Sequence, residues 1–357
     1  ASRLRWAWMA CLVATFAWSL RAWLFGRASP TWGVAAVAAP LFGQLVGFSV
    51  MHDASHAALS TKRWVNVLGG YGGITWTSPH EWFLQHVLAH HLAPNVHGED
   101  PDVVHVDRYR KVRRSRVPAY AALVWAVALP VGLTVLAPLR VFRTRTYPAS
   151  RTTDRPRSKL ADLSHVAGRC LYLLVFIVWP FYYRSEWSLC ARLVWVFAPQ
   201  VLGSAIFMLV TQIAHLAEDL GCVPPASSLS GGRGEESLTS WHRHQLATAR
   251  NYAVDSPFHT WFTGGLNYQV EHHLFPTVNH CHLAAIAPLV KQCAAEWGAP
   301  YRVISGFAEG LRTHLSLLEK LAKTTEEDDD DEADSSADSS ADSSADASSS
   351  SSSSSDN

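Results

Sequence analysis

Histidines recur in this sequence at spacings that suit metal binding. The stretch MHDASH carries His52 and His56 four residues apart, and the stretch QHVLAHH carries His86, His90 and His91. On a helix, side chains three or four positions apart are neighbours about 6 Å from each other. Two imidazoles placed in this way can hold one metal ion or two adjacent ions. Both stretches therefore predict metal-binding motifs on helices.

A third group lies in the stretch YQVEHHLFP, which carries Gln269, His272 and His273. His215 adds another imidazole at the end of a long apolar run. Each group borders apolar sequence, where a polar side chain without a partner is unfavourable. Shared metal binding explains this recurrence better than separate packing roles for each residue.

The candidate ligands are too numerous for one tetrahedral zinc ion, which takes about four. Two metal ions are the economical interpretation. Imidazole binds iron, copper and zinc alike, so the spacing leaves the metal open, although oxygen activation at a membrane would make it iron. The complete set of candidate ligands is His52, His56, His86, His90, His91, His215, Gln269, His272 and His273.

Other polar residues near these groups are expected to have lesser roles. Asp100 and Asp102 flank Pro101 and either orient ligand imidazoles or simply form a turn. Glu271 lies between ligands but would point away from them on a helix, so it is expected to cap the helix or to pair with an arginine. The histidines expected outside the centre, most of them in loops or at the surface, are His80, His97, His105, His242, His244, His280 and His282.

The elements that must position these residues are apolar helices. Hydrophobic residues make up 48% of the 357 residues and include 15 Trp, a composition that favours a membrane protein. A helix needs roughly 20 apolar residues to cross a bilayer. Four runs are candidates, at about 6–25, 31–51, 168–183 and 189–211.

A fifth apolar run, 117–139, is interrupted by prolines and has dense positive charge on both sides. Because positive residues prefer the cytoplasmic side, this run is predicted to be interfacial or re-entrant. The segment 64–77 is short and rich in glycine, so it is also expected at the interface. Four crossings then leave all the histidine groups on one side of the membrane, the cytosolic side.

These observations predict an all-α integral membrane protein. Its four transmembrane helices would carry a cytosolic helical cap that holds a histidine-rich dimetal site. Residues 1–325 form this predicted membrane domain, whereas residues 326–357 are mostly acidic residues and serine and are predicted to be a disordered tail. Nucleic-acid binding is not expected, because the basic residues flank apolar segments instead of forming a separate basic module.

The stretches HDASH, HVLAHH and QVEHH are similar to the three histidine boxes of membrane fatty acid desaturases. Glutamine at the first position of the third box, within WFTGGLNYQVEHHLFP, resembles the front-end desaturases, which act between an existing double bond and the carboxyl end of an acyl chain. The stretches HHLAPNVHGEDPD and SWHRHQLATARNY also resemble segments of this family. The likeness covers roughly residues 40–300.

The resemblance implies a non-haem di-iron site whose ligands are the eight candidate histidines, with Gln269 as a ligand or near-ligand. The reaction of the family takes dioxygen and two electrons and removes two hydrogens from adjacent methylenes. The implied substrate is a fatty acyl lipid or an acyl-CoA. The implied location is the membrane of the endoplasmic reticulum or, alternatively, a plastid or bacterial membrane.

Two features depart from the family pattern. Front-end relatives usually carry an N-terminal cytochrome b5 domain with an HPGG motif, which does not occur in this sequence. Either the chain is part of a longer protein, or electrons come from a separate cytochrome b5 with its reductase or from ferredoxin. Several relatives also have asparagine four residues before the ligand at His215, where this sequence has Thr211.

Several functions remain open from the sequence. A front-end fatty acyl desaturase is the leading one, and a sphingolipid long-chain-base desaturase or a hydroxylase would use the same kind of site. A non-catalytic membrane metal-binding protein is the alternative from another class. Such a protein would place histidines inside its spans along a pathway, whereas here they gather at the ends of the spans and in polar segments.

Overall fold

The fold is helical throughout the part of the chain that the computed structural model describes, apart from one short sheet. The sheet pairs β1 (Asn251–Tyr252) with β2 (Val303–Ile304) in parallel. The predicted all-α class is therefore confirmed. The apolar run 117–139 and the tail 326–357 lie outside the described residues. The described residues are 3–26, 31–73, 79–96, 99–103, 159–220 and 235–317.

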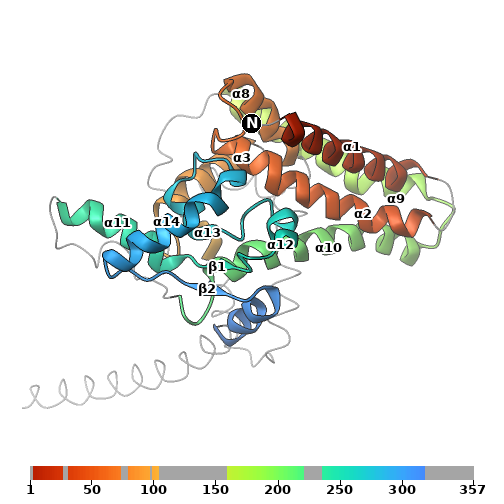
Figure 1. The fold of residues 1–357 in the computed structure, drawn as a ribbon. Coiled ribbons are helices and arrows are strands. Elements are labelled where there is room, and N and C mark those ends of the chain that lie inside the picture. The colour runs from red at the N-terminus through yellow and green to blue at the C-terminus, as the bar shows by residue number, and fades with distance from the viewer. Residues whose placement is uncertain are drawn as a thin grey trace, which may run out of the picture.

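Four helical segments among the described residues are long and apolar enough to cross a membrane, as predicted. The first and fourth are the α-helices α1 (Arg3–Phe25) and α10 (Leu189–His215), which are drawn side by side with the others in Figure 1. The second and third are interrupted by π-helical turns. The second comprises α2 (Thr31–Val46), η1 (Gly47–Met51) and α3 (His52–Ser55), and the third comprises α8 (Lys159–Leu173), η6 (Leu174–Val178) and α9 (Trp179–Tyr183).

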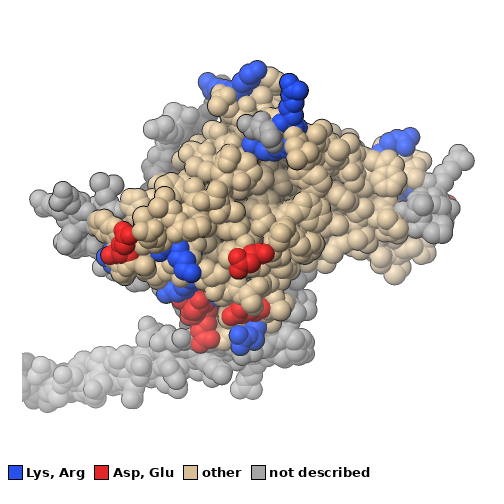
Figure 2. Space-filling model, in the orientation of Figure 1, with Lys and Arg blue, Asp and Glu red and all other residues tan. Residues whose placement is uncertain are grey.

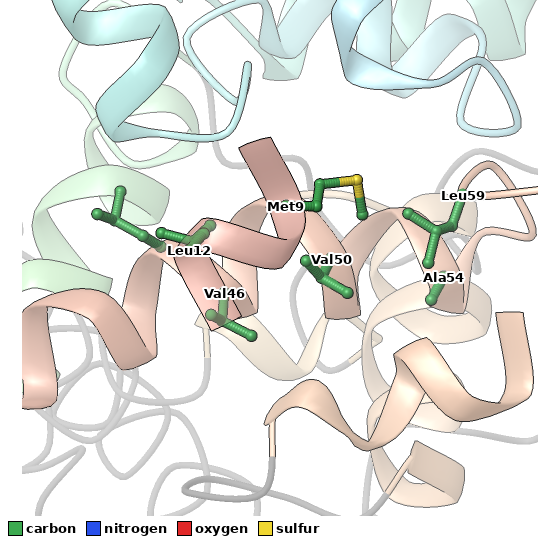
Figure 3. Close-up of a cluster of buried hydrophobic side chains, with 7 residues drawn as sticks. Met9, Leu12, Val46, Val50, Ala54 and Leu59 are labelled. Carbon is green, nitrogen blue, oxygen red and sulfur yellow. The ribbon is translucent and has the colours of Figure 1, made fainter. Parts of the chain in front are cut away.

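The first two of these segments pack closely against each other. Met9 and Leu12 of α1 belong to a buried cluster with Val50 and its neighbours in the second segment (Figure 3). Gly43 has no Cβ, which allows the two helices to approach closely. A Cβ at this position would lie only 3.0 Å from the ring of Phe16. Within lipid, such close van der Waals packing is what holds helices together, because the surrounding chains are as apolar as the helices.

The outer surface of this helical bundle is apolar. Val34, Leu171 and Val194 are exposed to 63%, 53% and 60%. Figure 2 shows few charged side chains over the bundle on the face that it draws. Exposed aliphatic side chains on satisfied helical backbone suit contact with lipid tails. The protein is therefore an integral membrane protein.

Shorter helices form a cap at one end of the bundle, on the left in Figure 1. The segment predicted at the interface begins as a short helix whose Trp64 and Leu68 are exposed to 62% and 64%. The elements of the cap are α4 (Arg63–Gly70), η2 (Tyr71–Gly73), α5 (Pro79–Trp82), η3 (Phe83–His90), η4 (Pro101–Val103), α11 (Glu235–Thr248), α12 (Pro257–Phe262), α13 (Gln269–Leu274), η8 (His280–His282), α14 (Leu283–Glu296) and a helix over 307–317.

The starts of the short cap helices are set by local sequence. Ser256 precedes α12, its hydroxyl accepts a hydrogen bond from the His259 N–H, and Pro257 occupies the first turn. Asn279 caps η8 in the same way, with its side-chain oxygen 3.2 Å from the Cys281 nitrogen. Side-chain caps and an initial proline are strong helix-start signals because they satisfy or remove unpaired N–H groups.

Gly264 allows the loop before α13 to lie against the second span. Its φ is +58°, and a Cβ there would lie 2.7 Å from the backbone carbon of Phe48. Gly298 has a φ of +60° but nothing within 4 Å of the same position. Both alanine variants would share the left-handed strain, and only Gly264→Ala would add a backbone clash.

Gly264→Ala is therefore expected to lower the thermal unfolding midpoint in detergent by several degrees more than Gly298→Ala. The measurement is a melting curve of each purified variant beside the unsubstituted protein. Equal shifts for the two variants would contradict the close packing of this loop on Phe48.

Candidate metal centre

The predicted ligands converge at the cap end of the bundle. They come from α3 and its C-cap, from η3 and its C-cap, from the last residue of α10 and from α13. All of them are buried, with at most 7% of any residue exposed. The structure brings together every member of the predicted set, namely His52, His56, His86, His90, His91, His215, Gln269, His272 and His273.

The ligand atoms form two adjacent groups. His91 lies between them, with its ring centroid 4.6 Å from that of His56 and 4.3 Å from that of His273. Gln269 lies beside the second group, with its Nε2 atom 2.8 Å from Nε2 of His215. A buried cluster of this composition can bind metal ions. Within each group the ligand atoms lie within 4.8 Å of one another; the first group is His52, His56, His86 and His272, and the second is His90, His215 and His273.

The central histidines converge because η3 is a π-helix. In an α-helix, positions four and five residues apart differ by about 40° and 140°, so His90 and His91 would not both share the face of His86. Here the His91 N–H bonds to the His86 carbonyl, five residues back. The ring of His86 consequently lies 5.4 Å from that of His90 and 4.8 Å from that of His91. The sequence predicted a helix but not this wider winding, which is frequent at functional sites.

Trp82 joins two elements that supply the first group. Its Nε1 donates to Ser55 Oγ at 3.2 Å, and its ring stacks on that of His86 with centroids 4.5 Å apart. The Ser55 hydroxyl in turn donates to the His52 carbonyl at 2.6 Å. Trp82 therefore fixes α3 relative to η3 and covers one side of the ligands.

Two imidazoles of the second group are oriented by acceptors at Nδ1. His215 Nδ1 lies 3.0 Å from the Thr248 carbonyl, and His273 Nδ1 lies 2.8 Å from Gln245 Oε1. Each acceptor favours the tautomer with its proton on Nδ1. That tautomer leaves the Nε2 lone pair free to bind a metal ion.

Asp100 orients the third imidazole of the second group. Both of its carboxylate oxygens lie 3.1 Å from His90 Nδ1, and it also accepts the backbone N–H groups of Asn95 and Asp102 at 2.8 and 2.9 Å. Burial by itself disfavours protonated His90, but Asp100 and Asp102 raise its pKa to about 9. Asp100 therefore both shapes the turn and orients a candidate ligand.

The remaining candidate histidines of the cap are held in the neutral form. Burial, followed by repulsion from a neighbouring imidazole, lowers the pKa of His56 to about 3. Neutral imidazole is the form that binds metal ions. The same two causes move the pKa well below its ordinary value at His86, His91, His272 and His273.

The positions of the nitrogens fit metal coordination. Nε2 of His52 lies 3.0 Å from Nε2 of His86. Two nitrogens bound at right angles to one ion, each about 2.1 Å from it, are about 3 Å apart. His56 and His273 have buried Nε2 atoms with no hydrogen-bond partner within the described part of the chain. A metal ion would give each of these two nitrogens a partner, so the residues present are suited to bind metal.

The third motif is held by a buried polar network on the far side of α13. Glu271 accepts hydrogen bonds from Asn251 Nδ2 and from the Tyr301 hydroxyl, both at 2.7 Å. Asn251 Oδ1 also accepts the Val270 N–H at 2.9 Å. Burial raises the pKa of Glu271. The expected capping role or arginine partner for Glu271 is wrong, because its partners come from segments distant in the sequence.

A second polar network, at the first group, was not predicted. Asp53 lies between the ligand candidates of the first motif, accepts from Asn279 Nδ2, and has its Oδ2 atom 2.7 Å from His280 Nδ1. His280, which was expected at the surface, is partly buried by this contact, with 19% of its side chain exposed. The place of Asp53 inside the motif was an available signal. Asn279 and His280 are too far along the chain for spacing to reveal them.

Arg250 and Asn95 fix the end of α10, from which His215 projects. Arg250 is buried, and its Nε donates to the Ile213 carbonyl at 2.8 Å while its guanidinium pairs with Asp219 at 2.6 Å. Asn95 Nδ2 donates to the His215 carbonyl at 2.7 Å. These bonds satisfy carbonyl groups that a helix end would otherwise leave unpaired. Neither residue was predicted from the sequence.

Three other histidines that the structure describes, His242, His244 and His282, lie outside the cluster. His244 Nε2 lies 2.9 Å from the Pro94 carbonyl, and His242 and His282 are exposed. His80 belongs to α5, whereas His97 and His105 lie outside the described residues.

Thr211 occupies the position where several relatives of the resembled family have asparagine. Its hydroxyl donates to the Phe207 carbonyl, one turn back along α10, at 3.0 Å. This bond is a common arrangement for threonine inside a helix. The Thr211 hydroxyl is therefore bonded to the helix backbone.

Comparison with known proteins matches this chain to fatty acid desaturases. The family model described as "Fatty acid desaturase" matches residues 27–305. The acyl-lipid (8-3)-desaturase B of Dictyostelium discoideum is 27% identical over 78% of this chain and 61% of its own length. The acyl-lipid (8-3)-desaturase of Physcomitrium patens is 29% identical over 79% of this chain and 59% of its own.

A shorter relative is matched over more of its length. The sn-1 linoleoyl-lipid 6-desaturase of Arthrospira platensis is 27% identical over 78% of this chain and 74% of its own length. The chain thus spans about three fifths of the two (8-3)-desaturases and about three quarters of the 6-desaturase.

The role of Asp100 can be tested through metal retention. Asp100→Asn removes the charge that holds His90 in place, and loss of such a partner weakens metal binding by about ten- to a hundredfold. We expect that loss in purified protein dialysed against a graded chelator, with metal counted by plasma mass spectrometry. The matched control is Glu296→Gln, an exposed carboxylate whose side chain pairs with Gln292. Equal retention in the two variants would contradict the assigned role.

Proposed function

The chain belongs to the fatty acid desaturase family, and we propose that it is a front-end fatty acyl desaturase. Such an enzyme inserts a double bond between an existing double bond and the carboxyl end of an acyl chain. The observation that carries the proposal is the buried cluster of eight histidines and Gln269 at the cap end of four span-length helices. The glutamine in the third motif favours the front-end class within the family.

In this proposal the centre would hold two iron ions, one in each group of ligand atoms. With dioxygen and two electrons, iron supplies an oxidant able to remove hydrogen from an unactivated methylene, which no side-chain base can do. His91 would join the first group, and Gln269 would be a ligand or near-ligand of the second. Asp100, Thr248 and Gln245 hold the Nδ1 protons of their histidines, so that the opposite nitrogens point to the metals.

The protein itself must place two adjacent methylenes beside the centre and keep water away. Phe48 and Phe207 stack with centroids 6.1 Å apart between the bundle and the centre, and Trp82 covers His86. The net reaction converts two methylenes, dioxygen, two electrons and two protons into a double bond and two waters. Apolar walls suit a substrate that offers the site only hydrocarbon.

The substrate in this proposal is an acyl chain carried by a membrane lipid or by coenzyme A. The relatives from Dictyostelium discoideum and Physcomitrium patens are named for acyl lipids, which favours a lipid carrier. The bilayer around the spans would supply such a substrate directly.

The proposal also includes an electron donor and a membrane. The proposed donor is cytochrome b5 with its reductase, or ferredoxin, and the proposed membrane is that of the endoplasmic reticulum, or alternatively a plastid or bacterial membrane. Residues 1–325 form the catalytic membrane domain, and residues 326–357 form an acidic tail without a part in the chemistry.

Expression in yeast tests the proposal. Cells producing the chain with cytochrome b5 would be fed eighteen- and twenty-carbon polyunsaturated acids, and their fatty acid methyl esters analysed by gas chromatography and mass spectrometry. We expect a new double bond on the carboxyl side of an existing one. The product should disappear in His273→Ala and persist in His282→Ala, an exposed histidine outside the cluster.

The absence of any new acyl product, with the protein present in the membrane, would overturn the fatty acyl assignment. New unsaturated or hydroxylated sphingoid bases in the same cells would redirect it to long-chain bases. Retained iron without any oxygen-dependent product would instead indicate a metal-binding protein.

A further inference from the structure

The helix over residues 307–317 packs on the end of α10. It follows Ser305, the last residue that the family model matches, and it is drawn in blue below β2 in Figure 1. The residues that contact α10 or its neighbours recur at positions i, i+3, i+4 and i+7, so they share one face of the helix. They are Gly310, Thr313, His314 and Leu317.

Gly310 lets this helix lie directly against α10. A Cβ at Gly310 would lie 2.8 Å from the Cβ of Ile213, well inside the separation of about 3.5–4.0 Å at which carbon atoms pack. Thr313 adds polar contacts, because its hydroxyl accepts a hydrogen bond from the Arg250 guanidinium at 2.7 Å and its carbonyl accepts the Glu218 N–H at 3.4 Å. Packing and hydrogen bonds therefore both hold the helix against the last turn of α10.

The end of α10 has four carbonyl groups that the helix itself does not pair. Carbonyl groups at a helix C-terminus lack an N–H partner in a following turn. Here each of the four accepts a hydrogen bond from a segment distant in the sequence. Arg250 donates to two of them, and Asn95 and His314 donate to one each; the carbonyls are those of Ile213, Ala214, His215 and Leu216.

The His314 side chain is suited to donate this bond. Only 5% of the residue is exposed, and its Nδ1 atom lies 2.7 Å from the Leu216 carbonyl oxygen. A carbonyl group only accepts hydrogen bonds, so the ring proton lies on Nδ1. Burial lowers the pKa of His314, which keeps the imidazole neutral with this N–H as its single donor.

The same helix also reaches the segment that orients His90. Leu317 belongs to a buried cluster with Val103. The Val103 N–H bonds to the carbonyl of Asp100, whose carboxylate lies against His90 Nδ1. The helix therefore contacts the supports of two of the three histidines in the second group, His215 and His90.

We propose that His314 is a positioning residue for the second group of ligand atoms. Its hydrogen bond to the Leu216 carbonyl holds the end of α10 in the position from which His215 points into the centre. The inference rests on the proposed function, because it takes the second group as a metal site. His314 does not touch the centre, and it acts through the backbone that carries His215.

Two substitutions of nearly equal shape separate the hydrogen bond from packing. His314→Asn can place an amide N–H where the histidine has Nδ1, whereas His314→Leu has no donor. Purified protein loaded anaerobically with Fe(II) would be dialysed against a graded chelator and its iron counted by plasma mass spectrometry. We expect His314→Leu to release one of two iron ions at a chelator concentration about two- to tenfold lower, the effect of one buried hydrogen bond, and His314→Asn to retain both.

The matched control is Arg312→Gln, since Arg312 is exposed on the same helix. It should retain iron like the unsubstituted protein. Equal retention in the two His314 variants would overturn the inference. Loss of both iron ions together with a lower thermal unfolding midpoint in His314→Leu would also overturn it, because that result indicates a general structural role. Failure of the unsubstituted protein to bind iron would overturn the proposed function and this inference with it.

Hydrogen exchange tests the position of the helix end without metal. Amide exchange would be followed by mass spectrometry in the metal-free variants, comparing peptides over residues 209–216 with peptides from α1. We expect exchange over 209–216 to be about two- to tenfold faster in His314→Leu than in His314→Asn, with no difference in α1. Equal exchange at the end of α10 would show that the Leu216 carbonyl does not need the His314 donor, and would overturn the inference.

Discussion

The main physical constraint on this structure is the burial of eight imidazole side chains in one place. Eight histidines are buried in one centre, and burial and repulsion between neighbouring imidazoles lower the pKa of most of those in the cap, whereas Asp100 and Asp102 raise the pKa of His90. Neighbouring neutral imidazoles can hydrogen-bond to each other, but the buried Nε2 atoms of His56 and His273 have no hydrogen-bond partner within the described residues, so their lone pairs favour a species that binds them. Metal ions do so, and acceptors on the outer nitrogens at Asp100, Thr248 and Gln245 determine which nitrogen points inward.

The helical bundle serves this centre by delivering ligands at the ends of its spans. α10 ends at His215, and the second span continues through its π-helical turn into His52. Ligands on these two segments place the centre at the inner edge of the apolar region, where a lipid tail can reach it. Gly264 lets the loop before the third motif lie directly on Phe48, so the cap packs closely against the bundle there.

The sequence predicted the features that depend on local spacing and missed those that depend on contacts between distant segments. Long apolar runs and histidine motifs are local patterns, and they located the spans and every member of the cluster. The π-helical winding of η3 depends on packing, and nothing in its residue types distinguishes it from an α-helix. The partners of Glu271 and Asp53 lie 20 or more residues away, so intervals along the chain could not identify them. Nothing in the sequence distinguishes Arg250 from a surface arginine, but the fold buries it against α10.

We propose that the two groups of ligand atoms hold two iron ions. The most direct measurement is the iron content of protein loaded anaerobically with ⁵⁷Fe(II), combined with its Mössbauer spectrum. We expect a ratio near two irons per chain and a spectrum of iron bound by nitrogen and oxygen donors, in two sites of equal population. A ratio near one, or tightly held zinc that iron does not replace, would contradict it.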